Sequence, residues 1–128
     1  MLITGIDIIE IARVGEVLNK YGARFLNRIY TDSEQKYCKG RAAQLASRFA
    51  AKEAVMKALG TGIRGVGWKD IEIKRERGGP PYIQLHGGGQ ARASIMGLSE
   101  ISLSLSHSND FAVASVVGEA KRGNRLTK

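Results

Sequence analysis

The stretch AAQLASRFAAKEAVMKALG, residues 42 to 60, decides the fold. It is rich in alanine and other strong helix formers, and Gly60 follows its last apolar residue. Its larger apolar side chains recur at helical spacing: Leu45, Phe49, Met56 and Leu59. We therefore expect one long helix over residues 42–59, and its apolar face must pack against another element.

Strands are expected both before and after this helix in the sequence. Residues 2–9 are a nearly unbroken apolar run, and DIEIKRE and YIQLH, joined by a five-residue connection rich in glycine and proline, are typical of a hairpin. EISLSLS alternates between aliphatic residues and serine, whereas FAVASVV is apolar on both faces and is expected at the centre of a sheet. The predicted fold class is α+β, with a mainly antiparallel sheet packed against one long helix.

Shorter helices complete the predicted order. Amphipathic patterns cover residues 11–20 and 24–29 with a break near Gly22, and the glycines after His86 lead into a short helix. TDSEQKYC begins a further helix, with Asp32 or Ser33 as its N-cap. We expect a single domain over residues 1–118 and a basic, flexible tail over residues 119–128.

Composition limits the class of protein. The chain has 128 residues, of which 43% are apolar and 25% charged, as in ordinary globular domains. Its one cysteine, Cys38, cannot form an internal disulfide and has no neighbouring metal ligand, which favours a structural role in a reducing compartment. No run approaches the ~20 apolar residues of a membrane helix, and the N-terminus does not resemble a secretion leader. We expect a cytoplasmic protein that does not bind membranes.

Net charge gives the first indication of function. Twenty basic against twelve acidic residues give a net charge of +8. Such an excess indicates a polyanionic partner: a nucleic acid, a phosphorylated cofactor or an acidic protein. Aromatic residues make up only 6% of the chain, too few for the stacking platform of a single-strand nucleic acid binder.

Asp7 is an isolated carboxylate in the apolar run of residues 2–9. Burying such a group without a partner is costly, so Asp7 needs one. Glu53 lies one helical turn after Phe49, at the border of the apolar face of the long helix. Glu53 forms either an ordinary surface ion pair with Lys57, four residues on, or shares a divalent cation with Asp7. Mg²⁺ suits the second arrangement, because it needs only one or two carboxylates and keeps waters and phosphate oxygens as its other ligands.

Two further segments could contact a phosphate. GTGIRGVG, residues 60–67, allows backbone N–H groups to approach a ligand, but it lacks the GK[ST] ending of a Walker loop and equally fits a helix cap with a loose connection. His107 stands between two serines at a strand end, where neighbours point to opposite faces, and no GxSxG elbow is present, so nucleophilic hydrolysis is disfavoured. His107 either binds a phosphate or ribose or has a structural role in a turn. His86 has no companion and no predicted role.

Taken in order, four segments resemble the holo-acyl-carrier-protein synthase family, the small single-domain 4′-phosphopantetheinyl transferases. They are GIDIIEIARV, RFAAKEAVMKALGTGI, DIEI followed by GGPPY, and SLSHSNDFAVASVV, and together they span about residues 2 to 117. The resemblance implies the 4′-phosphopantetheinyl transferase fold and an Mg²⁺-dependent enzyme of fatty acid biosynthesis. Its reaction moves the phosphopantetheine arm of coenzyme A to a serine of apo acyl carrier protein and releases adenosine 3′,5′-bisphosphate.

The resemblance also implies roles for individual residues. Asp7 and Glu53 would bind Mg²⁺ and, with Lys57 against the pyrophosphate, form the catalytic set. The implied contacts of coenzyme A are Arg48, Lys57, Gly60 and His107. The acidic carrier protein would dock on basic residues near the N-terminus: Arg13, Lys20, Arg24 and Arg28. The general base is either a metal-bound water or hydroxide oriented by Glu53, or Glu53 itself. Family members are homotrimers with sites between neighbouring protomers.

Two other functions fit part of the sequence. A small basic RNA-binding domain agrees with the net charge, but not with carboxylates in apolar surroundings or with the few aromatic residues. Its binding would fall steeply with salt and need no defined Mg²⁺ site. A Mg²⁺-dependent phosphohydrolase using the same two carboxylates would instead cleave coenzyme A with no acceptor present. The resemblance favours the transferase, without a nucleic acid partner.

Overall fold

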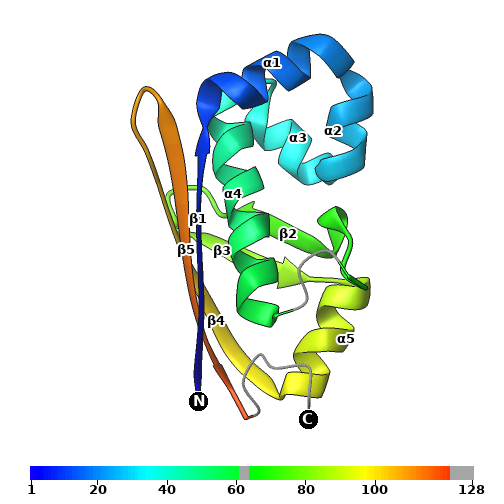
Figure 1. The fold of residues 1–128 in the computed structure, drawn as a ribbon, viewed down its shortest axis with the longest axis vertical. Helices are drawn as coiled ribbons and strands as arrows, with labels where there is room; N and C mark the ends of the chain where they lie inside the picture. The colour runs from blue at the N-terminus through cyan, green and yellow to red at the C-terminus, as the bar shows by residue number, and fades with distance from the viewer. Residues whose placement is uncertain (61–63, 122–128) are drawn as a thin grey trace.

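The computed structural model describes residues 1–60 and 64–121. The long helix α4 (Ala42–Leu59) covers a three-stranded antiparallel sheet, as predicted (Figure 1). That sheet consists of β1 (Leu2–Glu10), β5 (Phe111–Ala120) and β4 (Leu98–His107), in this order. The apolar strand β5 is central, as its two apolar faces predicted, and the α+β class is confirmed.

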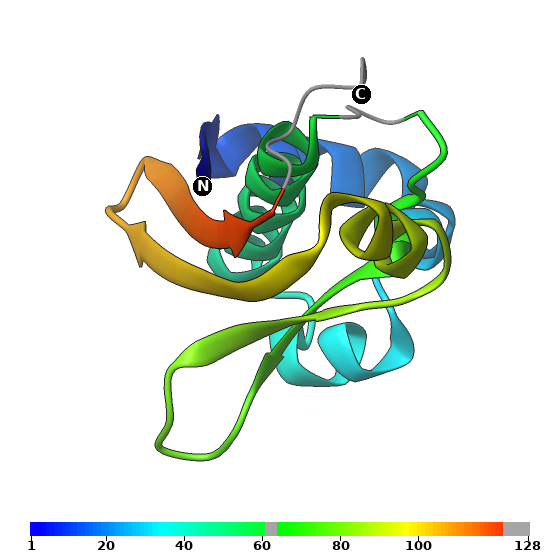
Figure 2. The ribbon, with the colours of Figure 1, turned by 90° about the horizontal axis from the view of Figure 1, so that it is seen from below.

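A separate hairpin adds a second sheet. Strands β2 (Ile71–Arg75) and β3 (Pro81–Leu85) pair antiparallel and follow the short 3-10 turn η1 (Trp68–Asp70). A connection of five residues joins them, as predicted, but it spans residues 76–80, one position before the predicted turn RGGPP. Figure 2 shows β3 running beside β4, with α5 (Gly87–Met96) at one end of the hairpin. The β2–β3 hairpin therefore packs against α4 and β4 without joining the three-stranded sheet.

The contact between α4 and β1 is unusually close. Gly5 of β1 lies against α4, and a Cβ atom at this position would overlap the carbonyl oxygen of Ala54. The helix presents small, fully buried side chains to its neighbours: Ala46, Ala50, Ala51, Ala54 and Ala58. Since neither surface has bulk here, the backbones approach closely, and this brings side chains at the rim of the contact near to one another.

Three short helices cover the first half of α4. They are α1 (Ile11–Tyr21), α2 (Ala23–Ile29) and α3 (Asp32–Cys38), and Gly22, with φ 54°, separates the first two where the sequence predicted a break. Their apolar faces form a second buried cluster with α4, which includes Val14, Tyr30 and Leu45. Cys38 is fully buried in this cluster, in line with the structural role expected for it.

The predicted cap of α3 is wrong by one residue. Thr31, not Asp32 or Ser33, is the N-cap: its hydroxyl accepts the Glu34 N–H at 3.2 Å, and the Glu34 carboxylate accepts the Thr31 N–H at 2.8 Å. This reciprocal pair is a capping box, which needs a threonine or serine three residues before a glutamate. Thr31 and Glu34 have that spacing, and Asp32 and Ser33 therefore fall in the first turn.

The C-terminal strand continues beyond the predicted domain boundary. β5 extends through Glu119 and Ala120, where Glu119 accepts a hydrogen bond from the N-terminal ammonium at 2.8 Å and the Ala120 N–H binds the Met1 carbonyl. The first residues of the expected tail thus pair with β1. The rest of that tail, residues 122–128, lies outside the described residues. Over the described chain, no helix is long and apolar enough to cross a membrane.

Candidate active site

Asp7 and Glu53 face the same cavity. Asp7 comes from β1 and Glu53 from α4, and both line a cavity of about 440 Å³ whose other walls include Ile9, Phe49 and Arg13. The close packing at Gly5 brings these two elements together. The sequence predicted this juxtaposition across more than forty residues of chain.

The direct partner of Asp7 is Lys57. The Lys57 ammonium lies 3.0 Å from Asp7 Oδ1 and also donates to the Ile6 carbonyl at 2.9 Å. Among the described residues, Lys57 therefore pairs across to the strand and does not form the ion pair with Glu53 that helical spacing allows. The three side chains of the predicted catalytic set are thus neighbours.

The electrostatics of the cavity favour a cation. Burial raises the pKa of the Glu53 carboxyl, the negative charge of Asp7 raises it further, and Lys57 partly offsets both effects. Two carboxylates that repel each other across a cavity are stabilised when a divalent ion is placed between them. Within the described ranges no cluster of three or more His, Cys, Asp or Glu side chains could hold a metal. The cavity therefore offers two carboxylates as metal ligands. Such a set suits Mg²⁺, which completes its coordination with waters and phosphate oxygens, and it lacks the nitrogen and sulfur ligands that zinc prefers.

A second cavity continues from the first along α1 and α2. It has a volume of about 520 Å³ and shares Val17, Phe25 and Phe49 with the carboxylate cavity. The two arginines in its lining are Arg24 and Arg28. Together the two cavities form a groove with an apolar floor and a basic rim that leads to the carboxylates. An acidic, partly apolar protein surface would fit such a groove.

Three of the four predicted docking residues line this groove: Arg13, Arg24 and Arg28. Lys20 does not, and its ammonium lies instead 5.4 Å from the centre of the Tyr21 ring. Sequence reasoning missed the aromatic floor, in which the Phe49 ring stacks on Trp68 with centroids 5.0 Å apart. Phe49 could have been found from its position on the apolar face of the predicted long helix. Trp68 follows a glycine-rich segment, and no sequence pattern indicated that it would contact Phe49.

Arg48 and His107 meet at another place. They line a cavity of about 110 Å³ together with Tyr37, Arg75 and the end of β4. Arg48 is buried, with its guanidinium 4.3 Å from the centre of the Tyr37 ring, whereas His107 is exposed. Two arginines and a histidine at one cavity suit a phosphate, and Arg75 was not foreseen.

Gly60 lines none of these cavities. It is the C-cap of α4 in the left-handed conformation, and its N–H is used on the Met56 and Lys57 carbonyls. This matches the capping alternative for the glycine segment. Residues 61–63 of that segment lie outside the described residues.

Comparisons with known proteins agree with one another. The family described as the 4′-phosphopantetheinyl transferase superfamily matches residues 3–116. The holo-[acyl-carrier-protein] synthase of Herpetosiphon aurantiacus is 45% identical over 125 residues, which cover 92% of this chain and 98% of that protein. That of Koribacter versatilis is 48% identical over 120 residues, covering 91% and 96%. The crystal structure of the Helicobacter pylori synthase in complex with coenzyme A superposes with a TM-score of 0.83 at 34% identity, covering 91% of this chain and 99% of that one.

Proposed function

The chain belongs to the 4′-phosphopantetheinyl transferases, as a holo-[acyl-carrier-protein] synthase, and on this premise we propose which of its residues carry the reaction. It transfers the 4′-phosphopantetheine group of coenzyme A to a serine of apo acyl carrier protein, giving the holo form and adenosine 3′,5′-bisphosphate. The RNA-binding and phosphohydrolase alternatives are set aside. Fatty acid biosynthesis as the pathway served and the cytoplasm as the location stay predictions.

We propose that Asp7 and Glu53 hold Mg²⁺. The observation that supports this most directly is that the two carboxylates line one cavity and that the charge of Asp7 raises the pKa of Glu53. Bound there, the ion would stabilise negative charge on the pyrophosphate of coenzyme A. Lys57, beside Asp7, would bind the same pyrophosphate and stabilise the leaving group. Glu53 would accept or direct the proton that the serine hydroxyl loses as it attacks phosphorus.

We further propose that Arg48 and His107 bind the 3′-phosphate end of coenzyme A. Their shared cavity and the additional Arg75 support this assignment. Arg48 and Glu53 are five residues apart on α4, and at 100° per residue their side chains leave the helix about 140° apart. One coenzyme A molecule that contacts Mg²⁺ and Arg48 therefore fits better between two copies of the chain than within one.

We propose a homotrimer with its sites between neighbouring protomers. The outer face of the three-stranded sheet supports an assembly, because large apolar side chains of β1 and β5 are exposed there: Leu2, Ile6, Ile8, Phe111 and Val117. A group of exposed large apolar side chains of this kind often marks an interface. β1 forms part of this face and carries Asp7 on its opposite side. A neighbouring copy bound to the face would therefore lie beside the site.

The acidic acyl carrier protein is proposed to dock in the groove of Arg13, Arg24 and Arg28. The groove ends at the carboxylates, so a docked partner could bring its serine to the proposed metal. Lys20 stays a candidate at the edge of this surface.

The function is tested by the intact mass of an apo carrier protein incubated with this enzyme, coenzyme A and Mg²⁺. We expect the mass to rise by one phosphopantetheine group, and the increase to disappear when the metal is chelated.

Glu53→Gln is expected to abolish transfer with an unchanged circular dichroism spectrum, because a neutral amide cannot replace the carboxylate as a ligand. Near-normal transfer by this variant would refute the metal assignment.

A further inference from the structure

Lys52 is a completely buried lysine that the proposed reaction does not use. Its side chain has 0% exposure, and it lies on α4 directly before Glu53 and four residues after Arg48. Lysine is almost never fully buried unless its charge is paired. The arrangement therefore needs an explanation beyond packing.

The ammonium of Lys52 has three fixed partners. It lies 2.8 Å from Glu34 Oε1 and donates hydrogen bonds to the Trp68 carbonyl at 3.0 Å and the Ile71 carbonyl at 2.5 Å. Burial lowers the pKa of Lys52, and the carboxylate of Glu34 opposes that effect. Three directional contacts thus tie the middle of α4 to η1, to the start of β2 and to α3.

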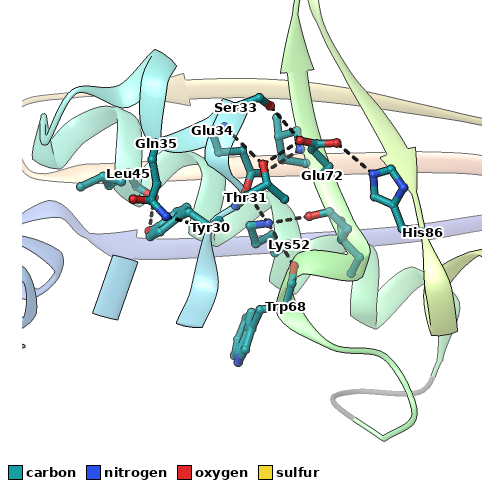
Figure 3. Close-up of polar contacts among 12 residues, drawn as sticks. Tyr30, Thr31, Ser33, Glu34, Gln35, Leu45, Lys52, Trp68, Glu72 and His86 are labelled. Carbon is teal, nitrogen blue, oxygen red and sulfur yellow. Dashed lines mark hydrogen bonds and ion pairs between the residues drawn. The ribbon is translucent and has the colours of Figure 1, made fainter. Parts of the chain in front are cut away.

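Glu34 is itself held rigidly. Its side chain is also fully buried, accepts the Thr31 N–H at 2.8 Å and accepts the Ile73 N–H at 2.7 Å. Glu72 extends the network by accepting hydrogen bonds from the Thr31 and Ser33 hydroxyls, and it contacts the His86 ring at 2.9 Å (Figure 3). Every buried polar side-chain atom among the described residues has a hydrogen-bond partner. The partners of Lys52 are therefore part of a connected framework.

The rest of α4 is held by its larger buried side chains, among them Val55 and Leu59, and by the contacts of Lys57 with β1. Much of the buried surface of α4 is nevertheless alanine, and alanines offer few protruding side chains to interlock with a neighbour. The helix also has no side-chain N-cap. Small residues thus secure the close approach, and the angle about the helix axis depends on directional contacts, of which Lys57 supplies two from an exposed position and Lys52 three from a buried one.

We propose that Lys52 is a positioning residue whose contacts with Glu34 and the Trp68 and Ile71 carbonyls set the rotation of α4. The inference rests on the proposed function, since Glu53 and Arg48, on either side of Lys52, are the proposed ligands of Mg²⁺ and of the coenzyme A phosphate. A rotated α4 would displace both side chains together. Lys52 lines neither of the cavities proposed for these ligands, so it would act only through the helix.

The test replaces both members of the buried pair, because removing one would leave the other charge buried alone. Mn²⁺ binding is measured by electron paramagnetic resonance, and coenzyme A binding by calorimetry, on the parent protein and on Glu34→Gln/Lys52→Met. We expect the double variant to bind each ligand about 10-fold more weakly, the usual effect of losing a residue that orients a ligand-binding side chain. The control is Met96→Ala, which removes a buried core side chain of α5 and should lower stability without changing either affinity.

Unchanged affinities in a folded double variant would overturn the proposal, and so would an equal loss in the Met96→Ala control. If the parent protein binds coenzyme A but no Mn²⁺, the metal assignment fails, and the coenzyme A affinity alone decides the role of Lys52. If the double variant does not fold, Glu34→Asp is used, which keeps a carboxylate on α3 but shortens its reach to the ammonium. It is then expected to weaken coenzyme A binding by a smaller factor, and parent affinity would refute the role.

Discussion

Glu72 shows what a single carboxylate contributes in this fold. Burial by itself raises its pKa, but hydrogen bonds from Thr31, His86 and Ser33 outweigh burial and lower the pKa to about 2. In the unfolded chain the group titrates near its ordinary value of 4.5. Between these two values the unfolded state binds more protons than the folded state, so stability falls as the pH falls.

We expect the free energy of unfolding to decrease between pH 4.5 and about pH 2, by an amount on the order of 2 kcal/mol attributable to Glu72. Urea denaturation at a series of pH values measures it. Glu72→Gln should flatten this part of the profile, and an equally steep profile in the variant would show that other carboxylates cause it.

The sequence indicated the proposed catalytic side chains more clearly than their contacts. Asp7 was conspicuous because a carboxylate interrupted an apolar run, and Glu53 because it bordered the apolar face of a helix. The contact of Lys57 with Asp7 was not predictable, because helical spacing offered Glu53 as a partner equally well. Lys52 and Glu34 gave no signal at all, since burial of a charged pair depends on three elements that meet only in the folded chain.

At the scale of elements, the distance between α4 and β1 determines whether the two carboxylates share a cavity. Gly5→Ala introduces a Cβ atom where the Ala54 carbonyl lies, so strand and helix must separate. We expect this variant to lose about 1–3 kcal/mol of stability and most of its transferase activity. Gly15→Ala is the matched control, because a Cβ atom there has its nearest neighbour at 3.8 Å and lies within α1.

Thermal unfolding and the rate of carrier-protein modification measure both effects. If Gly5→Ala retained parent activity at a temperature where it is folded, the close contact would serve stability alone.

Most elements followed from local pattern. The bounds of α4, the break at Gly22 and the central place of β5 were predicted from periodicity and glycine positions. The division of the strands into two sheets was not, because pairing partners distant in sequence leave no mark on a single strand. The cap at Thr31 was missed although its capping-box spacing was visible in the sequence.

For the whole molecule, the exposed apolar face of the sheet should control assembly. Ile6 is 62% exposed in the isolated chain, and burial of such a side chain between copies contributes ~1–2 kcal/mol per protomer. Ile6→Glu is therefore expected to dissociate the proposed trimer, as measured by sedimentation velocity. A trimeric Ile6→Glu protein would exclude this face as the interface.

Three of the twenty basic residues line the groove: Arg13, Arg24 and Arg28. We expect Arg24→Glu to raise the KM for carrier protein about 10-fold and to leave the KM for coenzyme A nearly unchanged, because it reverses a charge that faces the acidic partner. Lys20→Glu is the matched control, since Lys20 lines neither cavity of the groove, and its effect should be smaller. Equal rises in both KM values would contradict a docking role for Arg24.

The burial of Cys38 has a practical consequence. It is the only cysteine in the sequence, it has no exposed surface, and burial raises the pKa of its thiol to about 11. A thiol that is both inaccessible and protonated reacts slowly with maleimides. One cysteine introduced on the surface can therefore be coupled to a dye without first removing the native one, so that energy transfer between two labelled populations can report whether copies associate as the proposed trimer requires.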